Sequence, residues 1–476
     1  MTAPGLRRTK REITAEIHHE FQSLDAPLKE LSELVRWALG GVNSTERDPI
    51  ASLSVTVPSI NSLDWLRARK TGPKFYWSGR DDDIEFAAVG IADIQTSEDE
   101  AGGALGDRLS SLAPDSTARY YGGMRFDAAR ETSREWEAFG VHRFVLPRFE
   151  LRCEGEETVL ICNLVLPRDA EQIEEITREI DSLLEVEVSP YEALPKLEDR
   201  RDLPDAEGWR ANLEGALAAF ESDPLKKVVL ARRVDLSSVS ELDPLMLMDN
   251  LAARTPDCFH FYFEPEAGVA FLGASPERLY RRNERSIESE AVAGTRPRGE
   301  SAVDDADLSE ELLNSSKDLS EHAYVRLSIE EKLGPLCERL EVEEQASEMK
   351  LARGRHLVSR VRGTLNETVT DTEVLWTLHP TPAVGGYPRE DALEGIRASE
   401  PFDRGWYAGP IGWIGAGSAE FAVGIRSGLV CGREISLYSG AGIVSGSVPD
   451  DEWAEIEQKI GDFTRIFGLE PAHARS

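Results

Sequence analysis

The amino-acid sequence lacks the features that define several large classes of protein. Its 476 residues include five cysteines, an odd number without a CxxC pair, which argues against a disulfide framework and a thiolate zinc site. No apolar run of about eighteen residues occurs, so no membrane-spanning helix is expected. The basic N-terminal residues are not followed by the apolar run of a signal peptide. We therefore expect a cytoplasmic protein that does not enter a membrane.

Positive charge is also scarce. The chain has 54 Lys and Arg against 87 Asp and Glu, a net charge of −33. Phosphates would be repelled, so nucleic acids and anionic membrane surfaces are not expected partners. The acidic residues are spread along a chain with 41% hydrophobic residues, which indicates a folded protein and not a disordered acidic one. An acid-coated surface of this kind is typical of a salt-adapted cytoplasm, and we expect a halophilic source.

The order of predicted elements indicates an α+β fold. After a polar extension (1–45) with a helix near 28–39, a strand-rich subdomain (46–200) is expected, with a hairpin of 74–77 and 84–91. A second unit over 205–470 has the order helix, strand, helix and two hairpins. Sequential hairpins imply antiparallel pairing, so we predict large antiparallel sheets packed with helices.

Two strand ends carry candidate catalytic side chains. In 271–278, FLGASPER, a buried strand is expected to break at Gly273 and to place Glu277 in a turn beside Pro276, where a general acid would be held in place. Lys227 opens a second apolar strand. If the two strands are neighbours, the amine and the carboxyl face a common space. Taken singly, each side chain is more often solvated.

Two pairs of carboxylates occur at helical spacing. Asp318 and Glu321 lie in the middle of a long helix predicted over 307–333, and Glu452 and Glu455 lie at the start of the last helix. Mg²⁺ prefers a few carboxylates together with water and substrate oxygens, so two such pairs could hold it. With 87 acidic residues such pairs also arise by chance, and their position in the fold has to decide.

Other residues suit an anionic ligand. Arg426 is expected in the middle of a strand over 420–430 among apolar neighbours, a poor place for a cation unless an anion meets it. Small residues at 293–295 and 440–442 leave backbone N–H groups open to a carboxylate, although each is also an ordinary glycine turn. A small dicarboxylate that binds with Mg²⁺ would use all of these groups. A non-catalytic acidic scaffold would explain the charge but not Arg426.

Ten ordered motifs between about 205 and 470 resemble those of the chorismate-utilising enzymes. They are KVVLARR, FLGASPERL, EAVAGTRPRG, KDLSEH, HLVSRVRGTL, LHPTPAVGG, YAGPIGW, FAVGIRSGLV, SGAGIVSGS and DEWAEIEQK. Within that family the resemblance is to isochorismate synthases, and KFYWSGRDDDIEFAAVG is similar to their first subdomain. The resemblance implies an anthranilate synthase component I-like fold, a monomer, and Mg²⁺-dependent isomerisation of chorismate to isochorismate, which would feed menaquinone or a catecholate siderophore.

The resemblance also implies roles for individual residues. Lys227 would be the base that activates water for attack at ring carbon 2, and Glu277 the acid that protonates the departing carbon 4 hydroxyl. His356, the third expected catalytic residue, would lie on the enolpyruvyl and carbon 4 side. The magnesium ligands would be Glu321 and Glu455, with Glu452 and Asp318 behind them or bound through water. The remaining substrate-binding residues would be Ala293, Gly294 and Thr295 for the ring carboxylate, and Tyr407, Arg426, Gly442 and Lys459.

Three positions separate the branches of this family. Aminating members generally lack a lysine at Lys227, and one group carries a nucleophilic lysine at the position of Ala293, so Lys227 favours water as the nucleophile. Salicylate synthases keep the lysine but tend to carry threonine at Ala383, and they expel pyruvate after isomerisation. Ala383 therefore favours stopping at isochorismate, with salicylate synthesis as the alternative. One methyl-sized change is worth only about 1–3 kcal/mol.

Overall fold

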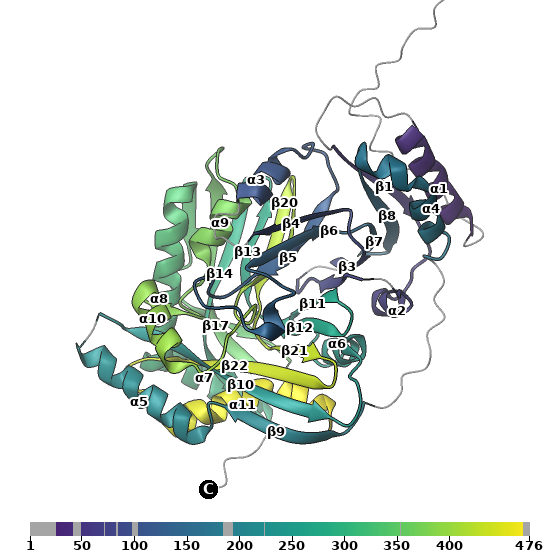
Figure 1. Ribbon diagram of the computed structural model, residues 1–476. Coiled ribbons are helices and arrows are strands. Elements are labelled where there is room, and N and C mark those ends of the chain that lie inside the picture. Colours follow the sequence, from purple (N-terminus) through teal and green to yellow (C-terminus); the bar gives the residue numbers. More distant parts are fainter. Residues whose placement is uncertain are drawn as a thin grey trace, which may run out of the picture.

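The structure, a computed structural model, describes residues 25–40, 49–70, 72–81, 84–97, 103–183, 194–222, 224–352 and 354–469. Most of the predicted N-terminal extension and Asp82 and Asp83 of the predicted hairpin turn lie outside these residues. Two large antiparallel sheets with helices packed on them form the described part of the chain (Figure 1). The predicted fold class is confirmed.

The first sheet has twelve strands, and every pairing within it is antiparallel. In spatial order its strands are β1 (Ile50–Thr56), β8 (Glu157–Val165), β7 (Phe149–Glu154), β3 (Ile84–Val89), β2 (Lys74–Ser78), β11 (Phe259–Glu266), β12 (Val269–Ser275), β21 (Ser427–Cys431), β22 (Glu434–Ile443), β10 (Lys227–Ser238) and β18 (Gly386–Tyr387), with β9 (Leu197–Leu203) also paired to β10.

The second sheet has ten strands, again with antiparallel pairing throughout. Its order is β15 (Cys337–Val342), β17 (Gly354–Leu365), β14 (Ser286–Pro297), β13 (Arg278–Asn283), β20 (Ser418–Val423), β19 (Pro410–Gly415), β5 (Arg119–Met124), β6 (His142–Leu146) and β4 (Asp93–Ser97), with β16 (Ser347–Lys350) paired to β17. Both sheets therefore combine strands from before and after residue 200.

Helices cover the outer faces of the sheets and their ends (Figure 1). They are α1 (Asp25–Gly40), α2 (Ser62–Arg67), α3 (Gly103–Ser110), α4 (Ile173–Ile180), α5 (Ala206–Ser222), α6 (Pro244–Ala252), α7 (Ala302–Asn314), α8 (Ser316–Leu333), α9 (Asp371–Leu378), α10 (Arg389–Ser399) and α11 (Pro449–Ile466). The two that matter most for the site are α8, which packs on β14 of the second sheet, and α11, which packs on β22 of the first. In the described residues no helix is long and apolar enough to cross a membrane.

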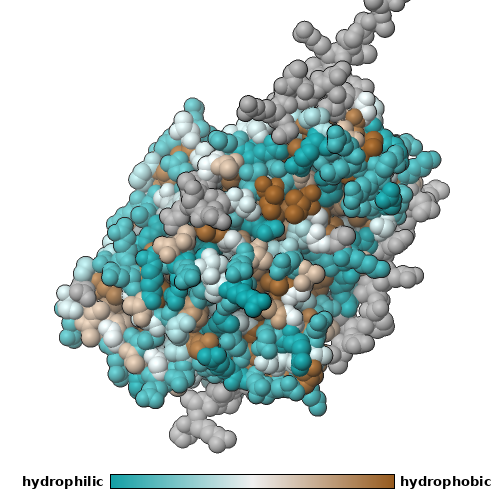
Figure 2. Space-filling view, viewed as in Figure 1, coloured by the Kyte–Doolittle hydropathy of each residue, from teal (hydrophilic) through white to brown (hydrophobic). Residues whose placement is uncertain are grey.

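Burial explains why these segments form strands. The β1 sequence IASLSVT alternates buried and half-buried side chains, as expected for a strand with one face on the core. After its first residue β12 is buried on both faces. One cluster of buried side chains joins both sheets and includes Phe86 of the first and Phe421 of the second, and another fills the space under α1, α2 and α6. The surface in Figure 2 is mostly hydrophilic.

Three sequence predictions about element boundaries are wrong. The strand does not break at Gly273, because β12 continues to Ser275; a Cβ at Gly273 would lie only 2.4 Å from the Phe261 ring, so glycine permits close packing there. The helix predicted over 307–333 is two helices, since Ser315 ends α7 and its hydroxyl accepts the Asp318 N–H to cap α8. Lys317 to Glu321 therefore lie in the first turns of α8 and not in the middle of a helix.

The third error concerns the strand predicted over 420–430. It is two strands, β20 and β21, that belong to different sheets, and the chain crosses between the sheets over residues 424–426. Arg426 lies in this crossing with a φ of 50°, in the left-handed region. The chain also crosses at 276–277, between β12 and β13. The two crossings are bonded together: the Ala274 N–H donates to the Arg426 carbonyl (3.0 Å) and the Val423 N–H to the Glu277 carbonyl (3.1 Å).

Candidate active site

A cavity lies where the two sheets, α8, α11 and both crossings meet. Of the fifteen residues that the sequence predicts for the site, fourteen line this cavity. They are Glu277 and His356; Ala293, Gly294, Thr295, Ala383, Tyr407, Arg426, Gly442 and Lys459; and Asp318, Glu321, Glu452 and Glu455. They come from β14, β17, β22, α8, α11 and the segments between strands, so a site spread over about 180 residues of sequence is brought together by the sheet topology.

Lys227 is the residue that does not line the cavity. It is the first residue of β10, and its side chain is completely buried. Its Nζ lies 3.0 Å from Glu321 Oε1, an ion pair without hydrogen-bond geometry to any described residue. The strand that begins with Lys227 and the strand that leads into Glu277 are not neighbours, because β21 and β22 lie between β12 and β10. The amine is thus linked to the cavity through its ion pair with Glu321.

Glu277 is a carboxyl that stays protonated near neutral pH. It lies at the sheet crossing and is 5% exposed. Burial raises its pKa to about 8, and the negative charge of Glu290 adds to this effect, while Lys227 and Lys459 oppose it. A neutral carboxyl can donate a proton, as a general acid must.

Another side of the cavity carries three carboxylates, each paired with a lysine. Glu321 on α8 meets Lys227. On α11, Glu452 Oε1 lies 2.6 Å from Lys317 Nζ, and Glu455 Oε1 lies 2.7 Å from Lys459 Nζ. Burial raises the pKa of Glu452, and the charge of Glu455 raises it further. Burial also acts to raise the pKa of Glu455, but Lys459, Lys317 and Arg426 outweigh it and hold that pKa below its ordinary value.

The chemical type of these side chains suits a magnesium ion, but their present arrangement does not. Their oxygens are the ligands that Mg²⁺ prefers, and they converge on one cavity from two helices. Within the described ranges, however, no three His, Cys, Asp or Glu side chains are grouped closely enough to hold a metal ion. The three lysines now supply the positive charge that this side of the cavity requires. Asp318 is also paired, with Arg296 at 2.9 Å.

Glycines let the chain come close to this side of the cavity. A Cβ on Gly442 would lie 2.0 Å from Glu321 Oε1 and 3.1 Å from Lys227 Cε, so any larger residue would push into the ion pair. Gly294 has a φ of 74°, and a Cβ there would lie 3.1 Å from that of Asp318. Both positions were predicted as open backbone turns, and both require glycine for a physical reason.

Arg426 and Tyr407 form the part of the cavity suited to a carboxylate. The Arg426 side chain is 22% exposed, and its ion pair with Asp462 is long at 3.6 Å, so its guanidinium is available to an anion. The Tyr407 ring stacks on Tyr438 with centroids 5.1 Å apart. Burial raises the pKa of Tyr407 above its ordinary value, which keeps its hydroxyl a donor.

His356 is held neutral. Its Nδ1 lies 3.1 Å from Thr295 Oγ1 and 3.3 Å from the Gly294 carbonyl. Burial lowers its pKa to about 3, and the charges of Arg426 and Lys459 act in the same direction. A neutral imidazole cannot supply a proton as an imidazolium ion, so His356 can bind or orient a ligand but is not the acid.

Some residues of the cavity were not predicted. Lys317 and Arg296 bond the acidic side chains Glu452 and Asp318. Lys317 lies in KDLSEH, four residues before Glu321, and that spacing could have indicated a shared face. Tyr438 gives no such signal, because its stacking on Tyr407 depends on how the two strands lie in space.

Comparison with known proteins identifies the family. A family model described as chorismate binding enzyme matches residues 34–468. The chain is 35% identical over 450 residues to the chloroplastic isochorismate synthase 2 of Arabidopsis thaliana, covering 87% of this chain and 79% of that protein. The solved structure of the menaquinone-specific isochorismate synthase from Escherichia coli matches with a TM-score of 0.80 and 31% identity, over 94% of this chain and 100% of that one.

A more distant structure matches in fold alone. Anthranilate synthase component I from Streptococcus pneumoniae aligns with a TM-score of 0.65 at 18% identity, over 94% of this chain and 100% of that one. The two sheets and their helices thus form the fold that the motifs predicted. The chain belongs to the chorismate binding enzymes, and its prediction as a member of that family is confirmed.

Proposed function

We propose that this chain is an isochorismate synthase, an enzyme that converts chorismate to isochorismate. The relatives that match most of the chain bear that name, in a plant and in Escherichia coli. The observation that carries the proposal is the protonated carboxyl of Glu277 in the same cavity as Arg426 and three glutamates. Chorismate has two carboxylates and a hydroxyl that must leave, so it needs cations and an acid.

In the proposed reaction, water attacks ring carbon 2 while the hydroxyl at carbon 4 leaves. One carbon–oxygen bond forms, the ring double bonds shift, and the other carbon–oxygen bond breaks. Glu277 gives its proton to the departing oxygen, which leaves as water. Lys227 accepts the proton of the attacking water, so no proton is gained or lost overall. A lysine acts as a base only as the neutral amine, and its ion pair with Glu321 must therefore weaken in the working enzyme.

We infer that Glu321 and Glu455 hold Mg²⁺, with Glu452 and Asp318 close behind them. When bound, the ion would supply positive charge for the ring carboxylate of the substrate and offset the charge of the glutamates. The three lysine–glutamate pairs support this proposal, because they place a cation beside each of these carboxylates, as a bound metal ion would.

The other cavity residues would bind and orient the substrate. Arg426 and Tyr407, with the backbone N–H groups near Gly442, would grip the enolpyruvyl carboxylate. Residues 293–295 would frame the ring carboxylate. Lys459 adds a cation, although in the structure its Nζ also donates to the Gly440 carbonyl at 2.7 Å. The product would feed the synthesis of menaquinone or of a catecholate siderophore.

The test is chromatography of the products after the purified chain is incubated with chorismate and Mg²⁺ in high salt, with an EDTA control. Isochorismate in equilibrium with chorismate, lost on chelation, is the expected result. Salicylate and pyruvate would mean that Ala383 does not protect the enolpyruvyl group and that the chain is a salicylate synthase. Absence of any product at every salt concentration would rule out both activities.

A further inference from the structure

Arg80 lies between β2 and β3, in a part of the chain where the sequence predicts no site residue. Its side chain is only 8% exposed, and its guanidinium carbon lies 5.1 Å from the centre of the Phe259 ring. Burying an arginine costs free energy unless anions and acceptors meet it. The partners of Arg80 therefore indicate its role.

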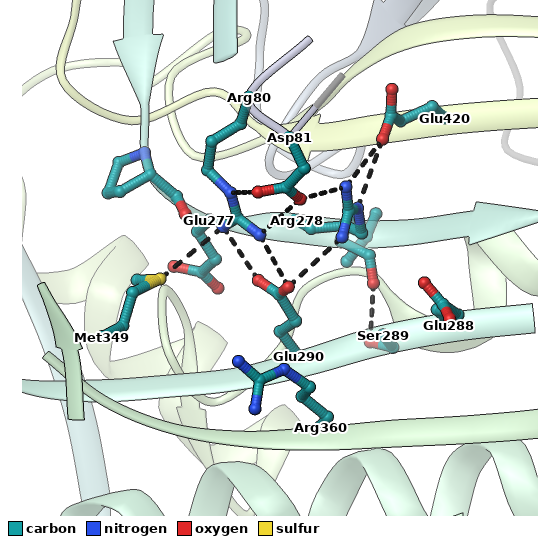
Figure 3. A network of polar contacts seen from close by, with 12 residues as sticks. Arg80, Asp81, Glu277, Arg278, Glu288, Ser289, Glu290, Met349, Arg360 and Glu420 are labelled. Atoms are coloured by element: carbon teal, nitrogen blue, oxygen red, sulfur yellow. Dashed lines mark hydrogen bonds and ion pairs between the residues drawn. The ribbon is translucent and has the colours of Figure 1, made fainter. Parts of the chain in front are cut away.

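All five N–H groups of Arg80 have an oxygen acceptor (Figure 3). Nε and Nη2 bond to the two oxygens of Asp81, each at 3.0 Å. Nη2 and Nη1 bond to the two oxygens of Glu290, at 2.7 and 2.9 Å. The last N–H, on Nη1, donates to the carbonyl of Pro276 at 2.5 Å. A lysine has three donors and no planar fork, so it could not make this set of bonds.

The Pro276 carbonyl belongs to the peptide group that leads into Glu277. The N–H of that peptide donates to Ser275 Oγ at 3.2 Å. The carbonyl of Glu277 itself accepts the Val423 N–H. Every backbone polar group around Glu277 is thus bonded, while its carboxyl has no hydrogen bond or ion pair to any residue that the structure describes.

The residue after Glu277 is tied into the same cluster. Arg278 bonds to Asp81 at 2.7 Å, to Glu290 at 3.3 Å and to Glu420 at 3.0 Å (Figure 3). Asp81 and Glu290 each contact both arginines. The cluster therefore holds the backbone on both sides of Glu277, and it links the hairpin of β2 and β3 to the crossing between the sheets.

We propose that Arg80 is a positioning residue for the acid Glu277: by bonding the Pro276 carbonyl from the β2–β3 hairpin, it fixes the peptide that aims the Glu277 carboxyl into the cavity. Arg80 does not line the cavity itself. The inference rests on the proposed function, in which Glu277 donates the proton.

The test is Arg80→Lys, which keeps the charge and loses the fork. We expect kcat to fall about 10- to 100-fold with KM within about threefold, because a catalytic group displaced by about 1 Å loses that much rate while substrate contacts remain. The matched control is Arg282→Lys. Arg282 is a buried arginine on β13 that bonds both oxygens of Asp371, at 2.7 and 2.6 Å, away from the Glu277 peptide. It should lose comparable thermal stability at unchanged kcat.

A second variant covers the case in which Arg80→Lys does not fold. The Asp81 side chain is 45% exposed, so Asp81→Asn should fold. It should lower kcat about 3- to 10-fold, because it weakens the pair of hydrogen bonds from Arg80 to the two Asp81 oxygens. Wild-type kcat in either folded variant, or an equal loss in Arg282→Lys, would overturn the inference. If the wild-type chain itself makes no isochorismate, the proposed function fails instead, and the two failures are distinct.

Discussion

The two sides of the cavity hold their carboxylates in opposite ways. On one side, Glu277 lies in a turn between strands, has no ion pair among the described residues, and has its pKa raised to about 8, chiefly by burial. On the other side, Glu321 and Glu455 lie on helices, and each forms an ion pair with a lysine. The pKa of Glu455 lies below its ordinary value, because the cations around it outweigh burial.

The difference follows from how each backbone is fixed. The turn at Glu277 is held through its peptide groups, so the carboxyl needs no partner and stays neutral in its buried position. The helices present several carboxylates close together, which repel one another and require cations. Environments that push two pKa values apart separate a proton donor from anions that can hold a cation. The same residue type is therefore held in two different electrostatic environments in one cavity.

The largest effect is expected from a substitution of Glu277, the protonated carboxyl. Glu277→Gln keeps the shape of the neutral carboxyl but cannot donate a proton, so kcat should fall by about 10²- to 10⁴-fold. Product chromatography with chorismate and Mg²⁺ measures the loss. Activity within about threefold of wild type would show that Glu277 is not the acid.

The same variant should be more stable than wild type in alkali. The folded protein keeps the Glu277 proton up to about pH 8, whereas the unfolded chain releases it near pH 4.5, the ordinary pKa of glutamate. The wild-type free energy of unfolding therefore falls as pH rises between these values, and glutamine removes this loss. Thermal unfolding at pH 4 and pH 9 tests this. An equal difference between the proteins at both pH values would contradict it.

Glu321→Gln tests the side of the cavity on which the carboxylates are paired with lysines. Removing one anionic ligand should weaken Mg²⁺ binding, measured by titration calorimetry, and should lower activity about 100-fold, because a metal ion supplies several kcal/mol of charge stabilisation. Asp318→Asn, on the same helix but bonded to Arg296, should cost only about 10-fold. If Glu321→Gln bound Mg²⁺ as tightly as the wild type, Glu321 on α8 would not be a ligand of the metal ion.

A smaller effect is expected between the two sides, at Arg426. Arg426→Lys keeps the charge but loses paired hydrogen bonding to a carboxylate, so kcat/KM should fall about 10- to 100-fold, mostly through KM. Arg465→Lys is the matched control, since Arg465 lies 3.6 Å from the same Asp462 and lines only the adjoining cavity, which shares Arg426 with this one. Its kinetics should stay within about twofold of wild type. Equal effects in both variants would exclude a direct contact between Arg426 and the substrate.

Much of the fold could be predicted, because alternation, caps and sequential hairpins are local signals. The errors arose where distant contacts decide. Gly273 stays in its strand because Phe261 packs against it, and the strand predicted over 420–430 divides because its two halves pair in different sheets. The site residues were predicted from the motifs that resemble the family. They could not show that Arg80 bonds Pro276, 196 residues away, or that two strands separate Lys227 from Glu277.

The smallest effect tests the electrostatic part of the comparison. The charge of Glu290 helps to raise the pKa of Glu277, while Lys227 and Lys459 lower it. Glu290→Gln removes that charge, yet its amide oxygen can still accept a bond from Arg80. The alkaline limb of the pH–rate profile, where Glu277 loses its proton, should therefore move to lower pH, by up to about one unit. Glu288→Gln, two residues earlier on β14, should leave the limb in place. A shift to higher pH, or an equal shift in both variants, would contradict a direct effect of the Glu290 charge on the pKa of Glu277.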